Sequence, residues 1–221
     1  RIGKKATMSK DKETLKEVEL LNKIKEALIQ NISIRKLEFD EEEQKIISGF
    51  RLITAKPIIY VANVSEEDLI SGGNNYVNAV KEYAGNEKSE VVMICAKIES
   101  ELAELELEEK TAFLQELGIE ESGLSSLIKS TYSLLGLATY FTVGSDEVKA
   151  WTFRKGMKAP QCAGVIHTDF EKGFIRAEVI KYDDYIKYGS ESAVREAGKL
   201  GVEGKEYVVQ DGDIMHFRFN V

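Results

Sequence analysis

The sequence predicts an α/β region and a separate α+β domain, with a helical arm in front of them. Two short apolar runs separated by a helical segment are typical of a parallel strand-helix-strand unit. From residue 137 onward the pattern becomes strand-rich and is interrupted by glycines, as expected for an α+β domain. A long amphipathic pattern without Gly or Pro occupies residues 10–29 and predicts the arm.

The arm is predicted over residues 1–54 as two antiparallel helices, the arrangement of a short coiled coil. Apolar residues recur at helical spacing in its first segment: Leu15, Val18, Leu21, Ile24 and Leu28. Asp40 followed by three glutamates predicts the capped start of a second helix, whose apolar stripe includes Ile46, Ile47 and Phe50.

The α/β region is predicted over residues 55–136. The apolar runs at 58–62 and 91–95 predict two strands buried in a parallel sheet, and the segment 75–83 predicts the helix between them. A crossover of this kind is expected to be right-handed. Helical patterns follow at 99–116 and 124–135.

The α+β domain is predicted over residues 137–221. Five strands are expected in it, at 138–143, 147–153, 174–181, 205–210 and 214–219. Two short helices are expected at 159–167 and 191–197. His167 is interpreted as a packing or capping residue, and Trp151 and Phe153 as core residues of a strand.

Composition excludes several classes of protein. No apolar run approaches the ~20 residues that span a bilayer, and the basic, polar start is not a secretory signal. The two cysteines, Cys95 and Cys162, indicate a reducing, cytoplasmic location rather than a disulfide framework. Together with His167 and His216 they show no metal-ligand spacing, so no metal site is expected.

Charge is distributed unevenly along the chain. The net charge is −8, and residues 59–136 carry 5 Lys and Arg against 15 Asp and Glu. The locally basic stretch is the first one, with Arg1, Lys4, Lys5, Lys10 and Lys12. It is either a solvated face or a contact with RNA phosphates.

The candidate binding residues follow the two predicted parallel strands, because ligands of α/β folds bind beyond the carboxyl ends of such strands. They are Asn63-Val64-Ser65-Glu66 and Cys95-Ala96-Lys97. Small GTPases have N-K-x-D and S-A-K at these positions, and the Asp pairs with two donors of guanine. With Glu66 in place of that Asp, guanine specificity should be lost. Taken alone, N-x-x-E is a weak signal and is more often a strand-end turn than a base-recognition motif.

Three strings in this order resemble the YchF or Obg-like ATPase family. They are AKPIIYVANVSEEDL at 55–69, CAKIESEL at 95–102 and APQCAGVIHTDFEKGFIRAEV at 159–179. The third resembles the TGS domain of that family, a ubiquitin-like β-grasp module. The resemblance implies the C-terminal half of a P-loop NTPase domain with an inserted helical arm, followed by the TGS domain.

The resemblance also implies roles for five residues. Asn63 would read the adenine edge through its amide, Val64 would contact the base through its backbone, and Glu66 would close the motif. Ala96 and Lys97 would line the base from the second strand. The implied cofactor is ATP with Mg in the full-length parent, and the implied partner is the ribosome or RNA.

One element of the family pattern does not occur in the sequence. There is no G-x-x-x-x-G-K-[ST] motif, and the chain begins without Met, as a fragment would. Phosphate-binding and switch segments carry phosphoryl transfer, so we expect no catalytic residue here, no ATP hydrolysis and no tight nucleotide binding by this chain alone. Two alternatives remain: a non-enzymatic RNA- or ribosome-binding adaptor, and an unrelated helical and β-grasp interaction protein.

Overall fold

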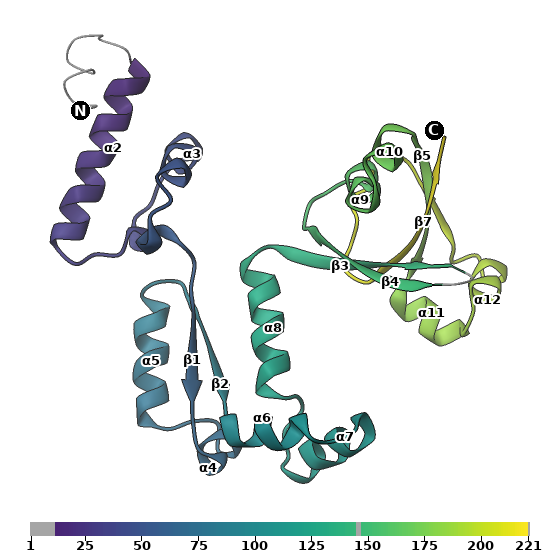
Figure 1. Ribbon diagram of the computed structural model, residues 1–221, viewed down its shortest axis with the longest axis horizontal. Helices are drawn as coiled ribbons and strands as arrows, with labels where there is room; N and C mark the ends of the chain where they lie inside the picture. Colours follow the sequence, from purple (N-terminus) through teal and green to yellow (C-terminus); the bar gives the residue numbers. More distant parts are fainter. Residues whose placement is uncertain (1–11, 145–146, 221) are drawn as a thin grey trace. The chain divides into compact units, whose positions relative to one another are not determined.

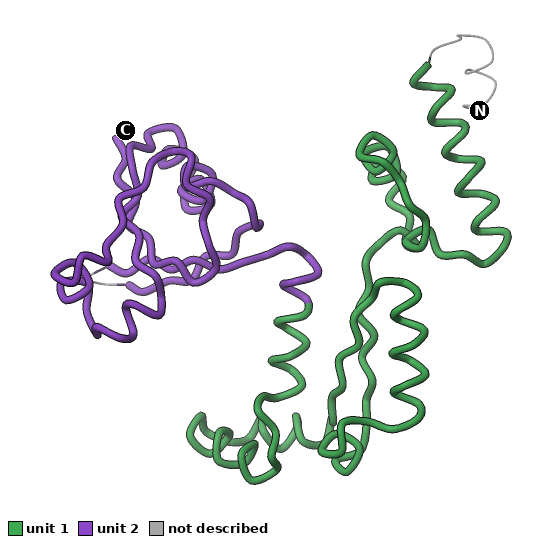
Figure 2. Tube along the Cα trace, turned by 180° about the vertical axis from the view of Figure 1, so that it is seen from behind, with its two compact units in different colours: residues 1–130 green, residues 131–221 purple. Residues whose placement is uncertain are grey.

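A computed structural model describes residues 12–144 and 147–220. The chain forms two compact units, residues 1–130 and residues 131–221 (Figure 2). Unit 1 contains helices and a two-stranded parallel sheet, and unit 2 contains helices and a five-stranded mixed sheet. The basic residues Arg1, Lys4, Lys5 and Lys10 lie outside the described residues.

Unit 1 begins with the helices that the sequence predicts. The elements are α2 (Lys12–Ile29), η1 (Ile34–Lys36), α3 (Glu41–Phe50) and η2 (Ile53–Ala55). Asp40 caps α3 as predicted, because its carboxylate accepts from the Glu43 N–H while the Glu43 side chain accepts from the Asp40 N–H. Five buried residues hold these elements together: Leu20, Ile24, Ala27, Ile34 and Ile47.

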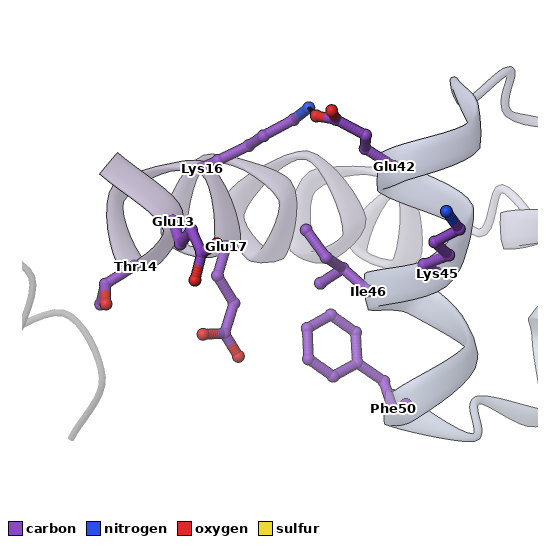
Figure 3. Close-up of a pocket in the computed structure, with 9 residues that line it drawn as sticks. Glu13, Thr14, Lys16, Glu17, Glu42, Lys45, Ile46 and Phe50 are labelled. Atoms are coloured by element: carbon purple, nitrogen blue, oxygen red, sulfur yellow. Dashed lines mark hydrogen bonds and ion pairs between the residues drawn. The ribbon is translucent and has the colours of Figure 1, made fainter. Parts of the chain in front are cut away.

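The two helices cross steeply instead of running antiparallel, so α2 and α3 do not form a coiled coil with each other (Figure 3). Lys16, near the start of α2, contacts Glu42 in the first turn of α3, with Nζ and Oε2 2.6 Å apart. In an antiparallel pair the first turn of α3 would instead lie beside the last turn of α2. The connector, with η1 in it, returns along α2 before α3 begins, as the 3.0 Å hydrogen bond from Lys23 to the Glu38 carbonyl shows.

The strand-helix-strand unit follows the predicted order. Its elements are β1 (Ile59–Asn63), α4 (Glu66–Ile70), α5 (Asn75–Gly85) and β2 (Glu90–Ile94), and then α6 (Ala96–Ala103), α7 (Leu107–Glu116) and α8 (Gly123–Leu134). The strands are parallel, and their last pair is Asn63 with Ile94. Two helices replace the single one predicted at 99–116, because Glu106 caps α7 in a capping box with Glu109.

Unit 2 has a mixed sheet with the strand order β4-β3-β7-β5-β6. Its elements are β3 (Leu137–Val143), β4 (Val148–Arg154), α9 (Ala159–Ile166), α10 (Thr168–Lys172), β5 (Phe174–Lys181), α11 (Tyr182–Tyr188), α12 (Glu191–Glu196), β6 (Gly201–Glu203) and β7 (Asp213–Phe219). β3 and β7 are parallel, and the other pairs are antiparallel. Helices α9 and α10 lie on one side of the sheet, and α11 and α12 on the other (Figure 1).

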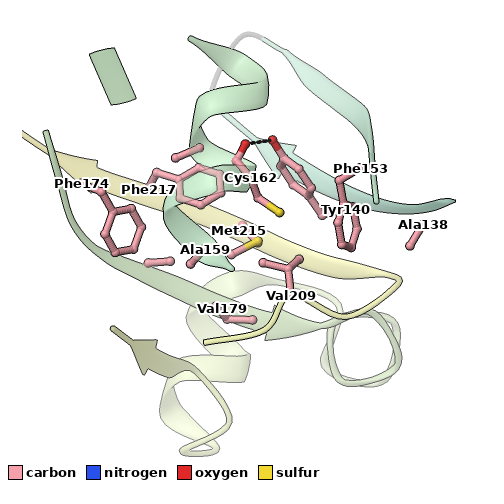
Figure 4. Packing of buried hydrophobic residues seen from close by; sticks show 12 residues of the cluster. Ala138, Tyr140, Phe153, Ala159, Cys162, Phe174, Val179, Val209, Met215 and Phe217 are labelled. Carbon is pink, nitrogen blue, oxygen red and sulfur yellow. Dashed lines mark hydrogen bonds between the residues drawn. The ribbon is translucent and has the colours of Figure 1, made fainter. Parts of the chain in front are cut away.

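The core of unit 2 lies between the sheet and α9 (Figure 4). Tyr140 and Cys162 are fully buried there, and the Tyr140 hydroxyl donates to the Cys162 carbonyl at 2.8 Å. Burial raises the pKa of the Cys162 thiol to about 12. Phe153 is buried and Trp151 packs against the same cluster, as predicted for core residues.

The prediction of a strand at 205–210 is wrong. The edge strand is β6, and residues 205–210 form a turn and a loop with a single bridge from Val208 to Lys158. Tyr207 and Val209 supply the apolar alternation that resembles a strand. In the structure Val209 packs into the core, and the Tyr207 hydroxyl donates to the buried Asp213 carboxylate at 2.7 Å.

Candidate functional site

The candidate site lies at the carboxyl ends of β1 and β2. Because the strands are parallel and end together at Asn63 and Ile94, the segments that follow them meet at one edge of the sheet. The first segment enters α4 and the second enters α6. Both helix starts therefore lie beside the strand ends.

Asn63 joins the two segments directly. Its side-chain Oδ1 accepts a hydrogen bond from the Ala96 N–H at 3.1 Å. This bond fixes the orientation of the amide, because Oδ1 is committed to the second segment. Among the hydrogen bonds of the described residues none uses Nδ2, so its two hydrogens are available to a ligand that presents an acceptor.

The turn between β1 and α4 is held by its own hydrogen bonds. The Val64 N–H donates to the Ile94 carbonyl at 2.8 Å, which extends the ladder between the strands by one bond. Ser65 caps α4 by accepting from the Asp68 N–H at 3.2 Å. With its N–H committed, Val64 can offer a ligand only its carbonyl oxygen.

Glu66 and Lys97 form an ion pair across the site. Lys97 Nζ lies 2.6 Å from Glu66 Oε1, and a second carboxylate, that of Glu101, lies 3.9 Å from Nζ. The hydrogen bond to Glu66 raises the pKa of Lys97, so the ammonium stays charged at neutral pH. Lys97 thereby balances the negative charge of the Glu66 carboxylate, at the position where a GTPase has the Asp that pairs with guanine.

A shallow depression of about 530 Å³ opens between these groups. It is lined by Asn63, Val64, Ser65, Glu66, Glu67, Cys95, Ala96 and Lys97. The structure thus brings together all five residues named from the sequence, and their roles toward a ligand remain predictions. Glu67 was not named as a site residue, and no motif in the sequence distinguishes it from its neighbours.

The floor of the depression is anchored to α8. Cys95 beneath it is buried, and Glu99 on α6 accepts from the Gly123 N–H at 2.7 Å. Gly123 has no room for a side chain, because a Cβ there would lie 2.7 Å from Cγ2 of Ile94. The starts of α6 and α8 are therefore fixed against β2.

The described residues offer neither a cluster of metal ligands nor a membrane-spanning helix. Within residues 12–144 and 147–220 there is no group of three or more His, Cys, Asp or Glu that could hold a metal ion. No helix in that part of the chain is long and apolar enough to cross a membrane.

Fold and site together define a mixed α/β protein whose candidate ligand site occupies the edge where α/β folds bind nucleotides. The chain belongs to the YchF and Obg-like ATPase family. A family model described as YchF-GTPase_C, a protein of unknown function, matches residues 137–220.

Individual relatives match nearly the whole chain. It is 59% identical to the Ribosome-binding ATPase YchF of Bacillus subtilis over 98% of this chain and 60% of that protein. It is 42% identical to the Obg-like ATPase 1 of Rattus norvegicus over 100% of this chain and 56% of that protein. The chain thus spans less than two thirds of the length of these curated relatives.

A solved structure agrees with the same assignment. The Schizosaccharomyces pombe YchF GTPase is 38% identical, with a TM-score of 0.81 over 94% of this chain and 55% of that one. The mixed α/β fold matches that structure over both units.

Proposed function

We propose that this chain is the base-recognising and partner-binding portion of an ATP-hydrolysing, ribosome-associated protein of the cytoplasm. In this proposal residues 1–54 form the helical arm, 55–136 the C-terminal half of the P-loop NTPase domain and 137–221 the TGS domain. Relatives named ribosome-binding ATPase support the partner and the activity.

The proposal rests on two contacts at the edge of the sheet: the Ala96 N–H orients the Asn63 amide, and Lys97 balances the charge of the Glu66 carboxylate. A purine offers N7 as an acceptor, and adenine adds an amino group as a donor. The Asn63 Nδ2 hydrogens suit N7, and the Val64 carbonyl suits the amino group. A free carboxylate would instead favour the donors of guanine, and Lys97 occupies the Glu66 carboxylate at 2.6 Å.

The residues present fit the base of ATP, and ATP with Mg would supply the phosphoryl group and its charge neutralisation when bound. Asn63, Val64, Ala96 and Lys97 would hold and orient the base. The exposed Lys97 side chain and the half-buried Glu66 side chain would close the depression from the side of α6 and α4. Phosphate binding supplies most nucleotide affinity in P-loop proteins, so we expect this chain alone to bind ATP no tighter than about 1 mM.

The test of base selection is competition binding in a protein of the length of the relatives. ATP should displace a labelled adenine nucleotide better than GTP does, and Asn63→Ala should weaken both nucleotides by about tenfold, since it removes one hydrogen bond and the support of the Ala96 N–H. Asn78→Ala, the same change at an exposed position of α5 outside the depression, is the matched control. A preference for GTP would contradict the proposed base recognition.

The TGS assignment is supported by the strand order of unit 2. In the order β4-β3-β7-β5-β6, the strand that comes last in the chain, β7, lies parallel to the strand that comes first, β3, in the middle of the sheet. Helix α9 packs over one face. This is the ubiquitin-like β-grasp arrangement. The same module would serve the alternative function, a non-enzymatic RNA- or ribosome-binding adaptor. Ribosome co-sedimentation with and without ATP in the longer protein separates the two, because an adaptor would bind equally well in both conditions.

A further inference from the structure

One face of the sheet in unit 2 packs against α11 and α12 where Ile180 and Ile214 lie, and it carries charged side chains along the rest of β5 and β7. Along β5 and β7 alternate residues point to opposite faces, and the buried positions Ala177, Val179, Met215 and Phe217 belong to the core beside α9. Their neighbours Arg176, Glu178, His216 and Arg218 therefore project from the opposite face, which we call the outer face. Arg176, His216 and Arg218 are exposed.

Two arginines lie directly opposite each other on this face. Arg176 on β5 pairs in register with Arg218 on β7, and like charges at directly opposite positions of neighbouring strands repel. Arg218 has a partner, since its guanidinium forms two hydrogen bonds with the Glu178 carboxylate, at 3.2 and 3.4 Å. No carboxylate in the described part of the chain forms an ion pair with Arg176.

Glu178 is shared by a second arginine. Arg195 on α12 lies 3.8 Å from the same carboxylate and 3.2 Å from Glu191. The hydrogen bond from Arg218, together with the nearby charges of Arg218, His216 and Arg195, holds the pKa of Glu178 below its usual value. Three guanidinium groups thus face two carboxylates, both already paired, in a chain whose net charge is −8.

We infer that Arg176, Arg195 and Arg218, the arginine patch, bind the phosphate backbone of ribosomal RNA. A phosphate between Arg176 and Arg218 would relieve their repulsion and give Arg176 the anionic partner that it lacks. The planar guanidinium fork matches phosphate geometry. Protein interfaces are centred on clusters of aromatic or aliphatic side chains, whereas the exposed apolar side chain that register places opposite Glu178 is a single valine, Val202, so RNA fits the patch better than an acidic protein does.

The inference rests on the proposed ribosome association and names its contact surface. The variant that tests it is Arg176→Glu, because Arg176 is exposed and its side chain forms no hydrogen bond or ion pair with the other described residues. The matched control is Lys172→Glu, which makes the same charge change on α10, on the opposite side of the sheet. Protein-free ribosomal RNA and whole ribosomes are the two probes, each titrated over a salt series with the full chain.

We expect Arg176→Glu to weaken RNA binding about tenfold at low salt and to reduce the slope of log K against log salt by about one, while Lys172→Glu changes affinity less than twofold. Equal binding by both variants would overturn the arginine patch and leave ribosome association standing. Loss of ribosome binding by Arg176→Glu, with no binding of free RNA by the unmodified chain, would assign the patch to a protein. If the unmodified chain bound neither probe, both the patch and the proposed partner would be overturned.

Discussion

Glu87 shows how a single buried carboxylate joins the two parts of unit 1. Its side chain is 1% exposed, and it lies 3.3 Å from Arg35 and 3.4 Å from Lys36, both in η1. The Tyr60 hydroxyl on β1 donates to it at 2.9 Å. Burial alone would raise the pKa of Glu87, but the bonds from Tyr60 and Lys36 and the two positive charges outweigh burial and lower it.

Glu87→Gln should therefore destabilise unit 1 by about 3 kcal/mol at neutral pH, because two cations lose their buried partner. A lowered folded-state pKa stabilises the fold above the unfolded value, near 4.3, and this contribution is lost as pH falls through the folded value. The difference between variant and wild type should thus shrink at acidic pH. Amide hydrogen exchange in β1 and η1 measures this difference in stability. The control is Glu82→Gln, which makes the same change at an exposed position.

A pH-independent difference, or one as small as that of Glu82→Gln, would show that the Glu87 charge contributes nothing to the fold.

The same side chain also shows a limit of sequence analysis. Glu87 stands in a polar turn with the sequence Asn-Glu-Lys-Ser, which predicts exposure. Its burial follows from how η1 packs against α5 and β1, and no local pattern records that packing.

At the scale of elements, β-branched apolar runs and helix caps were predictive, and short elements without such a signal were missed. The β-branched runs of β1 and β2 and the Asp40 cap gave the correct elements, because these signals are local. β6 has three residues, one of them glycine, and α10 and α11 have five and seven, so none was predicted. His167 was expected to cap or pack, and it caps α10 by accepting from the Asp169 N–H.

The candidate site, too, was predictable only in part. Parallel strands that end together required Asn63 and Ala96 to be neighbours, and the sequence predicted that much. The ion pair between Glu66 and Lys97 depends on how α4 and α6 are rotated about their axes. Strand periodicity does not fix that rotation, so the neutralised carboxylate could be found only in the structure.

Gly173 gives a test of the junction between α10 and β5. A Cβ at this position would lie 1.9 Å from the backbone oxygen of Asn220, whose N–H donates to the Gly173 carbonyl at 2.9 Å. Gly173→Ala should destabilise unit 2 by several kcal/mol, because backbone must move to admit the methyl group. Gly204→Ala, with no atom within 4 Å of its Cβ, should change stability by less than about 0.5 kcal/mol.

Urea denaturation followed by the fluorescence of Trp151, the one tryptophan of the chain, measures both glycine variants in unit 2. Equal midpoints for Gly173→Ala and Gly204→Ala would mean that the end of β7 moves aside without cost. The close approach of the chain at Gly173 would then contribute nothing to the free energy of unfolding of unit 2.

At the scale of the whole chain, the two units differ in the number of buried residues in their core clusters. The main cluster of unit 2 contains 12 buried residues beneath a five-stranded sheet. The clusters of unit 1 contain five and three, and Val61 on its two-stranded sheet is 44% exposed. Two-stranded sheets are marginal by themselves, so unit 1 should be the less stable unit.

The two cysteines report on this difference, since each unit has one buried thiol: Cys95 in unit 1 and Cys162 in unit 2. In a urea series with a thiol reagent, Cys95 should become labelled at a urea concentration about 1 M below that for Cys162, which corresponds to a stability difference of roughly 2 kcal/mol. Peptide mass spectrometry locates the label, and the Cys162 transition should coincide with the Trp151 fluorescence change. Cys95→Ala and Cys162→Ala identify each signal. Labelling of both thiols in a single transition would instead show that the chain unfolds as one cooperative body, because separate cores of unequal size open in order of their stability.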